Sequence, residues 1–318
     1  MSLQVCRDIN QLPQWKGPIS MVIGNFDGLH VGHQALFKES IQWSQQHQGV
    51  TVLLTFRPHP MSVLKRGVGF TTLFDDQDSI EQLDQIGVSA VFFQEFTESF
   101  AQTEPLLFLA KMLLGPLRPT HLVIGDDFRF GHNRQGDVGL LRQFCQGESI
   151  QLSVVGEHSF QGKRISSTWI RELLTQGDCE LTSKILGRDF YLRGEVVRGD
   201  QRGRSIGFPT ANLSPTVQFR PCLGVYWTQS SIDGQVYQSV TNVGIRPTFE
   251  NQKKVVSVET HVLDFDGDRL GDLYGKQMKV SFKKKIRNEL KFKSVEELVS
   301  QIKTDIAEVR SRMPSEST

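Results

Sequence analysis

Several features that narrow the class of a protein are scarce in this chain. Its 318 residues include four cysteines, Cys6, Cys145, Cys179 and Cys222, which are far apart and form no C-x-x-C pair. Neither a zinc knuckle nor a disulfide framework is therefore indicated. Scattered thiols in a chain of this length are typical of a reducing cytosol, so we predict a cytoplasmic protein.

An excess of one charge and long apolar runs are also missing. Lys and Arg number 36 against 35 Asp and Glu, a net charge of +1, so we expect no nucleic-acid partner. No uncharged apolar run approaches the length of a membrane span, and the first ten residues lack the pattern of a signal peptide. The short run Lys283 to Lys285 predicts a solvated strand face. No feature indicates an oligomeric state.

The first half alternates apolar, β-rich runs with segments of helical character. The runs are ISMVIGNF, VTVLLTF, SAVFFQEF, HLVIGDDF and QLSVVG, and the helical segments include HQALFKESIQWSQQH and EPLLFLAKMLLG. Continuous apolar runs are expected of strands buried on both faces, so the pattern predicts an α/β domain with a parallel sheet between helices. Ligands bind such sheets where strands end and helices begin.

The alternation of strand-like and helical segments ends near residue 183. A chain of 318 residues also favours two domains, which we place at 1–182 and 183–318. After a helical segment, STWIRELLTQGDCELTSKILG, come strand-like pieces in which Asp233-Gly234 is a strong hairpin signal. A final helix begins with a capping box, Ser294 and Glu297. The second half therefore predicts an antiparallel sheet or small barrel closed by a terminal helix.

Two histidines stand in the stretch GNFDGLHVGH, from Gly24 to His33, directly after the first apolar run. A metal site is disfavoured, because the stretch has no Glu between histidines at i and i+4 and no nearby Cys. An ordinary turn would explain the glycines. A phosphate site would also explain the place of His30 and His33, since a helix N-terminus attracts anions and imidazoles can donate to phosphate oxygens. Gly32 would then let a nucleotide approach the helix, and Asp27 could orient the loop.

Three further stretches, together with this motif, resemble a known family. They are TFRPHP (Thr55 to Pro60), GDDFRFG (Gly125 to Gly131) and RISSTWIR (Arg164 to Arg171). H-x-G-H after a first strand is similar to the signature of the nucleotidyltransferase superfamily. With the other three in this order, the first half resembles the adenylyltransferase module of bacterial bifunctional riboflavin kinase/FAD synthetases.

The resemblance implies a Rossmann-like nucleotidyltransferase domain in which FMN attacks the α-phosphate of ATP and pyrophosphate leaves. Such a reaction needs positioning and charge stabilisation more than a covalent nucleophile. The residues that it assigns to ATP are Gly24, Phe26, His30, Gly32, His33, Arg164, Ser167 and Thr168, with His30 and His33 also catalytic. Simple helix capping is the alternative for Ser167 and Thr168. The residues that it places on the flavin side are Pro58, His59, Pro60 and Asp127.

The second half has its own signature, GRSIGFPTANL, from Gly203 to Leu213. Thr210 and Asn212 alternate along an extended segment, so both side chains point to one side. Their oxygen atoms could hold Mg²⁺ bridged to ATP phosphates. The chain has no Walker P-loop, so phosphate binding would depend on glycine turns such as Gly207. A turn-rich stretch that ends in a strand is the structural alternative.

Glu259, in SVETHVLDF, is the candidate base, because a carboxylate in this apolar, β-branched setting could take the proton of the ribityl 5′-hydroxyl. GFPTAN, NVGIRPTF, VETHVLDF and DLYGK resemble the riboflavin kinase domain in order and spacing. The resemblance implies a six-stranded Greek-key β-barrel, Thr210 and Asn212 on Mg²⁺ and ATP, and a flavin-contacting flap that contains Arg287 and Glu289. The stretch DFDGDRLGDLYGK is longer than the usual pattern.

These patterns predict an enzyme that makes FMN from riboflavin and ATP and then FAD from FMN and ATP. Its partners would be these small molecules. A flavin- or nucleotide-binding regulator is an alternative, although degenerate motifs would then be expected and His33 and Glu259 are both present. An adenylyltransferase for another acceptor is a third reading, which GFPTAN argues against.

Overall fold

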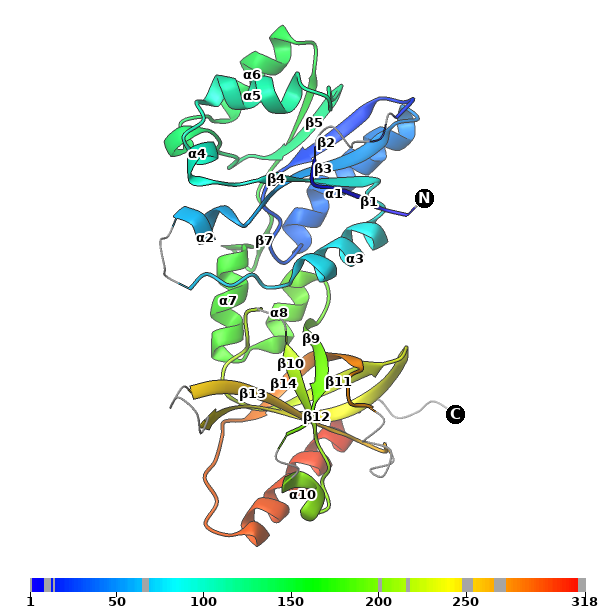
Figure 1. The fold of residues 1–318 in the computed structure, drawn as a ribbon, viewed down its shortest axis with the longest axis vertical. Helices are drawn as coiled ribbons and strands as arrows, with labels where there is room; N and C mark the ends of the chain where they lie inside the picture. Colours follow the sequence, from blue (N-terminus) through cyan, green and yellow to red (C-terminus); the bar gives the residue numbers. More distant parts are fainter. Residues whose placement is uncertain are drawn as a thin grey trace. The chain divides into compact units, whose positions relative to one another are not determined.

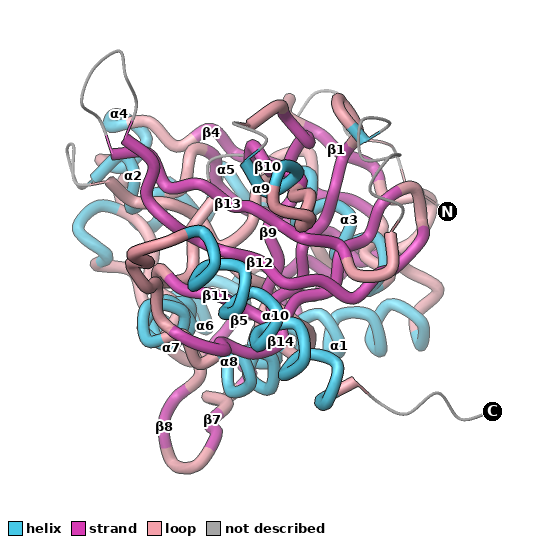
Figure 2. The backbone as a smooth tube through the Cα atoms, turned by 90° about the horizontal axis from the view of Figure 1, so that it is seen from below, coloured by secondary structure: helices cyan, strands magenta, loops and turns pink. Residues whose placement is uncertain are grey.

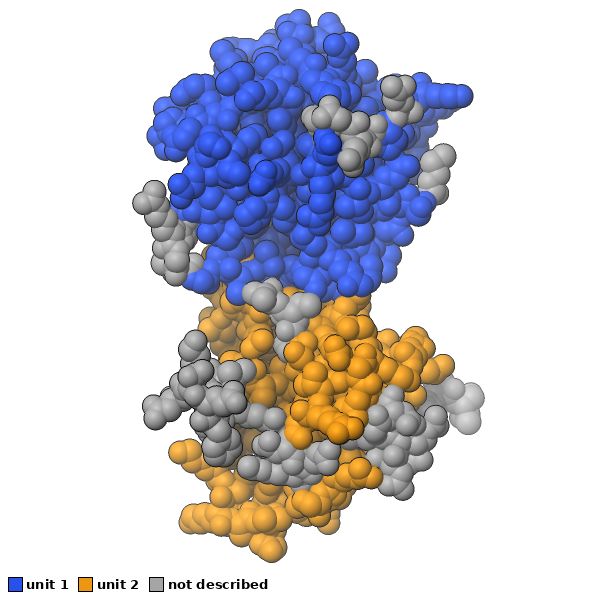
Figure 3. Space-filling view, viewed as in Figure 1, with its two compact units in different colours: residues 1–167 blue, residues 168–318 orange. Residues whose placement is uncertain are grey.

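The computed structural model describes residues 2–8, 13, 15–64, 69–199, 202–215, 218–247, 254–265 and 273–313. The chain divides into two compact units, Met1–Ser167 and Thr168–Thr318 (Figure 3). Each unit has its own sheet, and each is described by itself below. The predicted domain boundary between residues 182 and 183 stays a prediction.

A six-stranded parallel sheet forms the centre of the first unit (Figure 1). Its strands follow the spatial order β1-β4-β3-β2-β5-β6. Their bounds are β1 (Gln4–Cys6), β2 (Ile19–Ile23), β3 (Val50–Arg57), β4 (Ala90–Glu95), β5 (His121–Gly125) and β6 (Gln151–Val155). The five predicted strands are confirmed. β1, which pairs with β4 at the edge, is a strand that the sequence did not predict.

Helices cover both faces of this sheet because its strands are apolar on both sides. Alternate residues of a strand point to opposite faces. Val22 packs with Leu36 and Leu83, which belong to helices α1 (Val31–Gln46) and α3 (Asp76–Ile86). Met21 packs in a second cluster with residues of α5 (Pro105–Leu113) and α6 (Val138–Gly147). The smaller elements are α2 (Pro60–Leu64), α4 (Glu98–Ala101), η2 (His132–Arg134), and the hairpin of β7 (Ser159–Phe160) and β8 (Lys163–Arg164) (Figure 2).

The order of the sheet reverses between β2 and β5. From β2 the chain continues outward through β3 and β4, and it then returns to place β5 on the other side of β2. Ligands of open α/β sheets bind in the crevice beyond the carboxyl ends of the strands at such a switch point. The histidine turn follows β2, and Asp127 follows β5.

Two helices stand where the sequence predicted one helical segment. They are α7 (Ser167–Gln176) and α8 (Cys179–Leu186). Gly177 has a left-handed φ of +82°, which ends α7, and Asp178 caps α8 by accepting a hydrogen bond from the Leu181 N–H at 2.9 Å. Gly177 therefore ends the first helix and Asp178 begins the second, which divides the predicted segment into two helices.

The remainder of the second unit is a closed barrel with the order β10-β13-β12-β11-β14-β9. Its strands are β9 (Phe190–Val197), β10 (Ala211–Pro215), β11 (Gly224–Ile232), β12 (Gln235–Pro247), β13 (Lys254–Val262) and β14 (Gln277–Arg287), with a short helix α9 (Arg202–Ser205) before β10. The consecutive strands β11, β12 and β13 form a meander, and β14 returns to lie beside β11. This arrangement of four strands is a Greek key. Asp233 and Gly234 both have positive φ, as a two-residue hairpin turn requires.

The interior of the barrel holds a ladder of hydroxyl groups. The Thr228 hydroxyl lies 2.8 Å from that of Ser239 and 2.7 Å from that of Thr241, which lies 2.9 Å from that of Thr260. All four residues are fully buried. The alternate residues of these strands face outward, where α10 (Val295–Arg312) covers Val225 and Val240 with Val309. Ser294 caps α10 and accepts from the Glu297 N–H, as predicted.

The expectation of a solvated face at Lys283–Lys285 is wrong. Each of these half-buried lysines has a specific partner: Lys283 pairs with Asp189 at 2.5 Å, Lys284 with Glu180 at 2.8 Å, and Lys285 donates to the Cys222 sulfur at 3.1 Å. Each partner lies at least 63 residues earlier in the chain, so the charges that neighbour the run in the sequence could not indicate it. The insertion expected around residues 266–272 lies outside the described residues.

Candidate active sites

His30 caps helix α1 at the end of the turn that follows β2. Its Nδ1 accepts a hydrogen bond from the His33 N–H at 3.2 Å, and the two rings stack with centroids 3.5 Å apart. An accepting Nδ1 carries no proton, so the proton of a neutral His30 ring is on Nε2. That N–H is a donor suited to a phosphate oxygen at the positive end of a helix.

Small residues and one phenyl ring shape the turn around the histidines. A Cβ at Gly32 would lie 3.3 Å from the His30 ring and 3.4 Å from the Cβ of His158, so a side chain there would be tightly confined. A Cβ at Gly24 would lie 2.9 Å from the Phe26 ring. Phe26 is buried and contacts the His33 ring edge-on, with centroids 5.0 Å apart. The sequence did not indicate His158.

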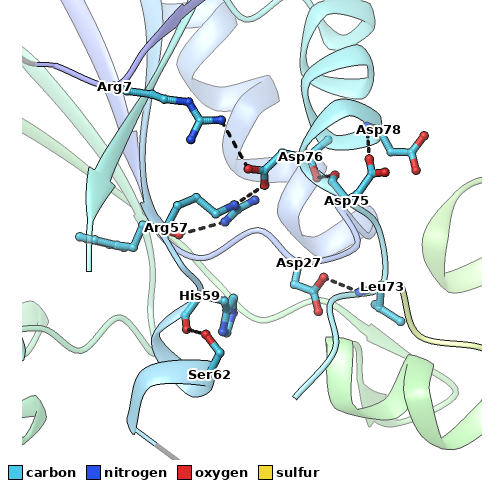
Figure 4. A network of polar contacts seen from close by, with 11 residues as sticks. Arg7, Asp27, Arg57, His59, Ser62, Leu73, Asp75, Asp76 and Asp78 are labelled. Carbon is cyan, nitrogen blue, oxygen red and sulfur yellow. Dashed lines mark hydrogen bonds and ion pairs between the residues drawn. The ribbon is translucent and has the colours of Figure 1, made fainter. Parts of the chain in front are cut away.

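Asp27 holds the turn from both its side chain and its backbone. Its Oδ1 accepts from the Leu73 N–H at 2.8 Å (Figure 4). Its carbonyl oxygen accepts from the Ser167 hydroxyl at 2.8 Å. The first residue of α7 is thereby brought to the histidine turn, and Thr168 follows it in that helix.

The predicted flavin-side segment lies where β3 ends and α2 begins, from Pro58 to Pro60. The His59 Nδ1 accepts from the Met61 N–H at 3.2 Å, and the ring stacks on Phe70 with centroids 4.4 Å apart. Arg57 precedes the segment and is fixed by Asp76 at 2.5 Å (Figure 4). Phe70 supplies an aromatic surface that the sequence motif did not contain.

The sequence resemblance assigns Asp127 to the flavin side and Arg164 to ATP. In the structure these two side chains pair with each other. Arg164 lies on the β7–β8 hairpin and also contacts Glu157 at 2.8 Å. About half of each of these three side chains is exposed. An exposed pair of this kind is held weakly, so its charges can exchange partners when a phosphate binds.

In the barrel, three polar residues form one row across adjacent strands. Glu259 on β13 stands opposite Asn212 on β10 and opposite Asn242 on β12. Directly opposed residues of antiparallel strands share a face of the sheet. Glu259 alternates with the buried Thr260, so the row lies on the outer face of the barrel.

A cavity of about 260 Å³ opens on this outer face. It is lined by Gly203, Ile206, Phe208, Thr210, Val225, Val240, Asn242, Glu259, His261, Arg287, Glu289, Leu290, Phe292, Leu298, Ile302 and Asp305. The predicted Thr210, Glu259, Arg287 and Glu289 are thus brought together. Gly207, with a φ of +86°, lies in the turn between α9 and β10.

Two acidic side chains define the flap side of the cavity. Arg287 contacts both carboxylate oxygens of Asp305 on α10, at 2.8 to 3.1 Å, and Asp305 is almost fully buried. The Glu289 side chain lies over Gly244 of β12. A Cβ at Gly244 would lie only 2.3 Å from the Glu289 Oε1. That Cβ would also lie 2.9 Å from the Asn242 amide nitrogen, so Gly244 leaves room for this approach.

Asn212 and Thr210 offer the oxygen ligands that Mg²⁺ prefers. The Asn212 side chain packs on the backbone of Gly199, where a Cβ would lie within 2.7 Å of its amide atoms. A glycine is therefore required beside this amide, and the donor set fits Mg²⁺. Within the described ranges, no cluster of three or more His, Cys, Asp or Glu side chains could hold a metal. No helix among these residues is long and apolar enough to cross a membrane.

Comparisons with known proteins match both units. A family model described as FAD synthetase matches residues 13–169, and one described as riboflavin kinase matches residues 186–313. A "Bifunctional riboflavin kinase/FMN adenylyltransferase" of Bacillus subtilis is 35% identical over 90% of this chain and 89% of its own length. The chain belongs to this family. The Escherichia coli K12 relative of the same name is 34% identical over 94% of this chain and 93% of its own.

One solved structure is similar to this chain in fold. It is titled as a macrolide-efflux protein from Streptococcus pneumoniae, is 28% identical, and matches with a TM-score of 0.86 over 98% of this chain and all of that one.

Sequence reasoning missed some lining residues although signals for them existed. Asn242 begins the quoted motif NVGIRPTF, and His261 lies two residues after Glu259, the spacing that keeps side chains on one face of a strand. Asp305 carried no such signal, because its role depends on how α10 crosses the barrel.

Proposed function

We propose that the barrel transfers the γ-phosphoryl group of ATP to riboflavin, and that the switch-point site joins the resulting FMN to the adenylyl group of ATP. The observation that carries this proposal is the presence of two separate sites with different designs. One is a pair of stacked imidazoles at a helix N-terminus, and the other is a single carboxylate, Glu259, between two asparagines beside a cavity.

At the switch-point site, we assign the ATP phosphates to His30, His33 and the start of α7. Ser167 and Thr168 add hydroxyl and backbone donors, and Arg164 adds charge after it leaves Asp127. Adenylyl transfer needs the attacking FMN phosphate in line with pyrophosphate, so these groups position reactants and neutralise charge. Gly24, Phe26 and Gly32 shape the turn. The tie between Ser167 and Asp27 supports this assignment.

We assign the flavin of FMN to the segment Pro58–Pro60 and to Asp127. The stacked His59 and Phe70 rings offer a planar aromatic surface beyond β3, and such surfaces favour planar ligands. Asp127 lies at the end of β5, on the other side of β2 in the sheet.

At the barrel site, Thr210 and Asn212 would hold Mg²⁺ and ATP, with Gly207 in the phosphate-binding turn. The metal would neutralise charge on the transferred phosphoryl group. Glu259 would take the proton of the ribityl 5′-hydroxyl as its oxygen attacks, and Arg287 and Glu289 would contact the flavin. The shared outer face of these residues supports the assignment.

The test is a chromatographic time course of the purified protein with riboflavin, ATP and Mg²⁺. FMN should rise first and FAD should follow. FMN without FAD would mean that the histidine turn serves another acceptor. The absence of both products would favour a binding protein, and binding of ATP and flavin would then be measured directly.

A further inference from the structure

The turn that carries Thr210 leaves the barrel at a proline. Strands β10 and β13 pair as far as Ala211, opposite Thr260. Pro209 lies two residues earlier, and because proline has no N–H it cannot continue the ladder by donating to β13. Some other contact must hold this end of the strand.

The His261 side chain supplies that contact. Its Nδ1 lies 2.8 Å from the carbonyl oxygen of Pro209. A carbonyl oxygen only accepts, so Nδ1 carries a proton and donates it to this bond. His261 belongs to β13 and lines the same cavity as Glu259. A side chain thus extends the pairing of β10 and β13 one step beyond the backbone ladder.

Two further contacts fit the turn to His261. The Phe208 N–H donates to the Gly203 carbonyl at 2.8 Å, which closes the turn. The Phe208 ring meets the imidazole edge-on, with centroids 5.6 Å apart and planes at 77°. Thr210 therefore follows two residues that are both in contact with His261.

We propose that His261 is a positioning residue of the kinase site, which fixes the Pro209–Thr210 turn beside Glu259 through its Nδ1–H. The proposal rests on the function assigned above to Thr210 and Glu259. With Nδ1 committed to Pro209, only Nε2 remains for a contact with bound substrate. The role of the imidazole is to hold Thr210 where Mg²⁺ and ATP need it.

The experiment compares His261→Ala, His261→Asn and His261→Gln in the full chain. The amide of Asn can place an N–H near the position of Nδ1, whereas that of Gln reaches toward Nε2. We expect His261→Ala and His261→Gln to raise the KM for ATP and the Mg²⁺ concentration of half-maximal kinase rate by about 10- to 100-fold. His261→Asn should recover most of this loss.

FMN adenylylation by the same samples reports whether the first unit is intact, and thermal melting reports whether the barrel is folded. A folded His261→Ala variant with unchanged KM and Mg²⁺ dependence would overturn the proposal. Equal losses in His261→Asn and His261→Ala would do so as well. Thr210→Ala separates the proposal for His261 from the function assigned to Thr210. If this variant leaves the kinase activity unaffected, the assigned function of Thr210 fails, whatever the His261 variants do.

Discussion

At the scale of single residues, His33 and Glu259 belong to different compact units, so their substitutions should separate the two activities. His33→Ala should lower FAD formation from FMN about 100-fold, as expected for one lost donor to the reacting phosphates, and leave FMN formation unchanged. Glu259→Gln should lower FMN formation at least about 100-fold and spare adenylylation. Each half-reaction is measured with its own substrate. Parallel loss of both activities in either variant would contradict these assignments.

His121 predicts a dependence of stability on pH. It is fully buried between Ser20, whose hydroxyl is 2.8 Å from Nδ1, and Ser153, 3.0 Å from Nε2, and its ring stacks on Trp43. Burial lowers the pKa of His121 from 6.5 to about 4. Between these values the unfolded chain binds a proton that the folded chain does not. The contribution of His121 to the free energy of unfolding is therefore fully present above pH 6.5. It decreases by on the order of 3 kcal/mol as the pH falls to 4.

The test compares thermal unfolding of the wild type, His121→Gln and His47→Gln from pH 7 to pH 4.5. His47 stacks on Trp43 as well, with ring centroids 4.1 Å apart, but it is exposed. His121→Gln should be less stable at pH 7 and should lose less with acid, whereas His47→Gln should keep most of the acid sensitivity of the wild type, because burial is the main cause of the low pKa of His121 and the charge of His47 a lesser one. Equal acid sensitivity of wild type and His121→Gln would show that another group is responsible.

Cysteine reactivity should be confined to one position. Burial raises the pKa of Cys6, that of Cys145 to about 11 and that of Cys179 to about 12. Cys222 is only partly buried, and its sulfur accepts from the Lys285 ammonium at 3.1 Å. A maleimide at pH 7.5 should label Cys222 before the other three, as peptide mass spectrometry would reveal. Labelling of the buried Cys145 at an equal rate would refute the prediction.

At the scale of elements, helix α10 offers a buried ion pair and an exposed one. Arg287 and Asp305 have side-chain exposures of 18% and 3%, whereas those of Arg310 and Asp264 are 55% and 67%. Asp305→Asn leaves Arg287 without its charge partner and should cost about 3 kcal/mol. Asp264→Asn should cost less than about 1 kcal/mol. The temperature at which the barrel unfolds measures both effects, and equal shifts would mean that burial does not distinguish the pairs.

Prediction from the sequence succeeded for elements whose pattern is long and local. The five longer strands, helix α1 and the capped helix α10 each carry a clear period or cap. β1 failed because three residues hold no period, and the break between α7 and α8 was missed although Gly177-Asp178 is a stop followed by a cap. Arg164 with Asp127, and His261 with Pro209, depend on how distant segments meet. Local spacing indicates which residue types are present but not which of them touch.

At the scale of the whole molecule, the position of the domain boundary can be tested with fragments. Helix α8 packs on β14 and β9, and the Leu174 carbonyl accepts from the Cys222 N–H at 3.0 Å. A fragment of residues 183–318 should fold and phosphorylate riboflavin. A fragment of residues 168–318 should do so with a higher melting temperature, because it keeps these contacts and the pair of Lys284 with Glu180. Equal melting temperatures would favour the boundary at residues 182 and 183.

Neighbouring residues of β13 face opposite sides of the barrel wall, so substitutions at them should have different effects. Thr260 belongs to the hydroxyl ladder inside the barrel, while its neighbours Glu259 and His261 line the cavity outside. A library of variants at residues 258–262 should therefore divide in two: changes at the buried 258, 260 and 262 should lower thermal stability, and changes at 259 and 261 should lower the rate of FMN formation.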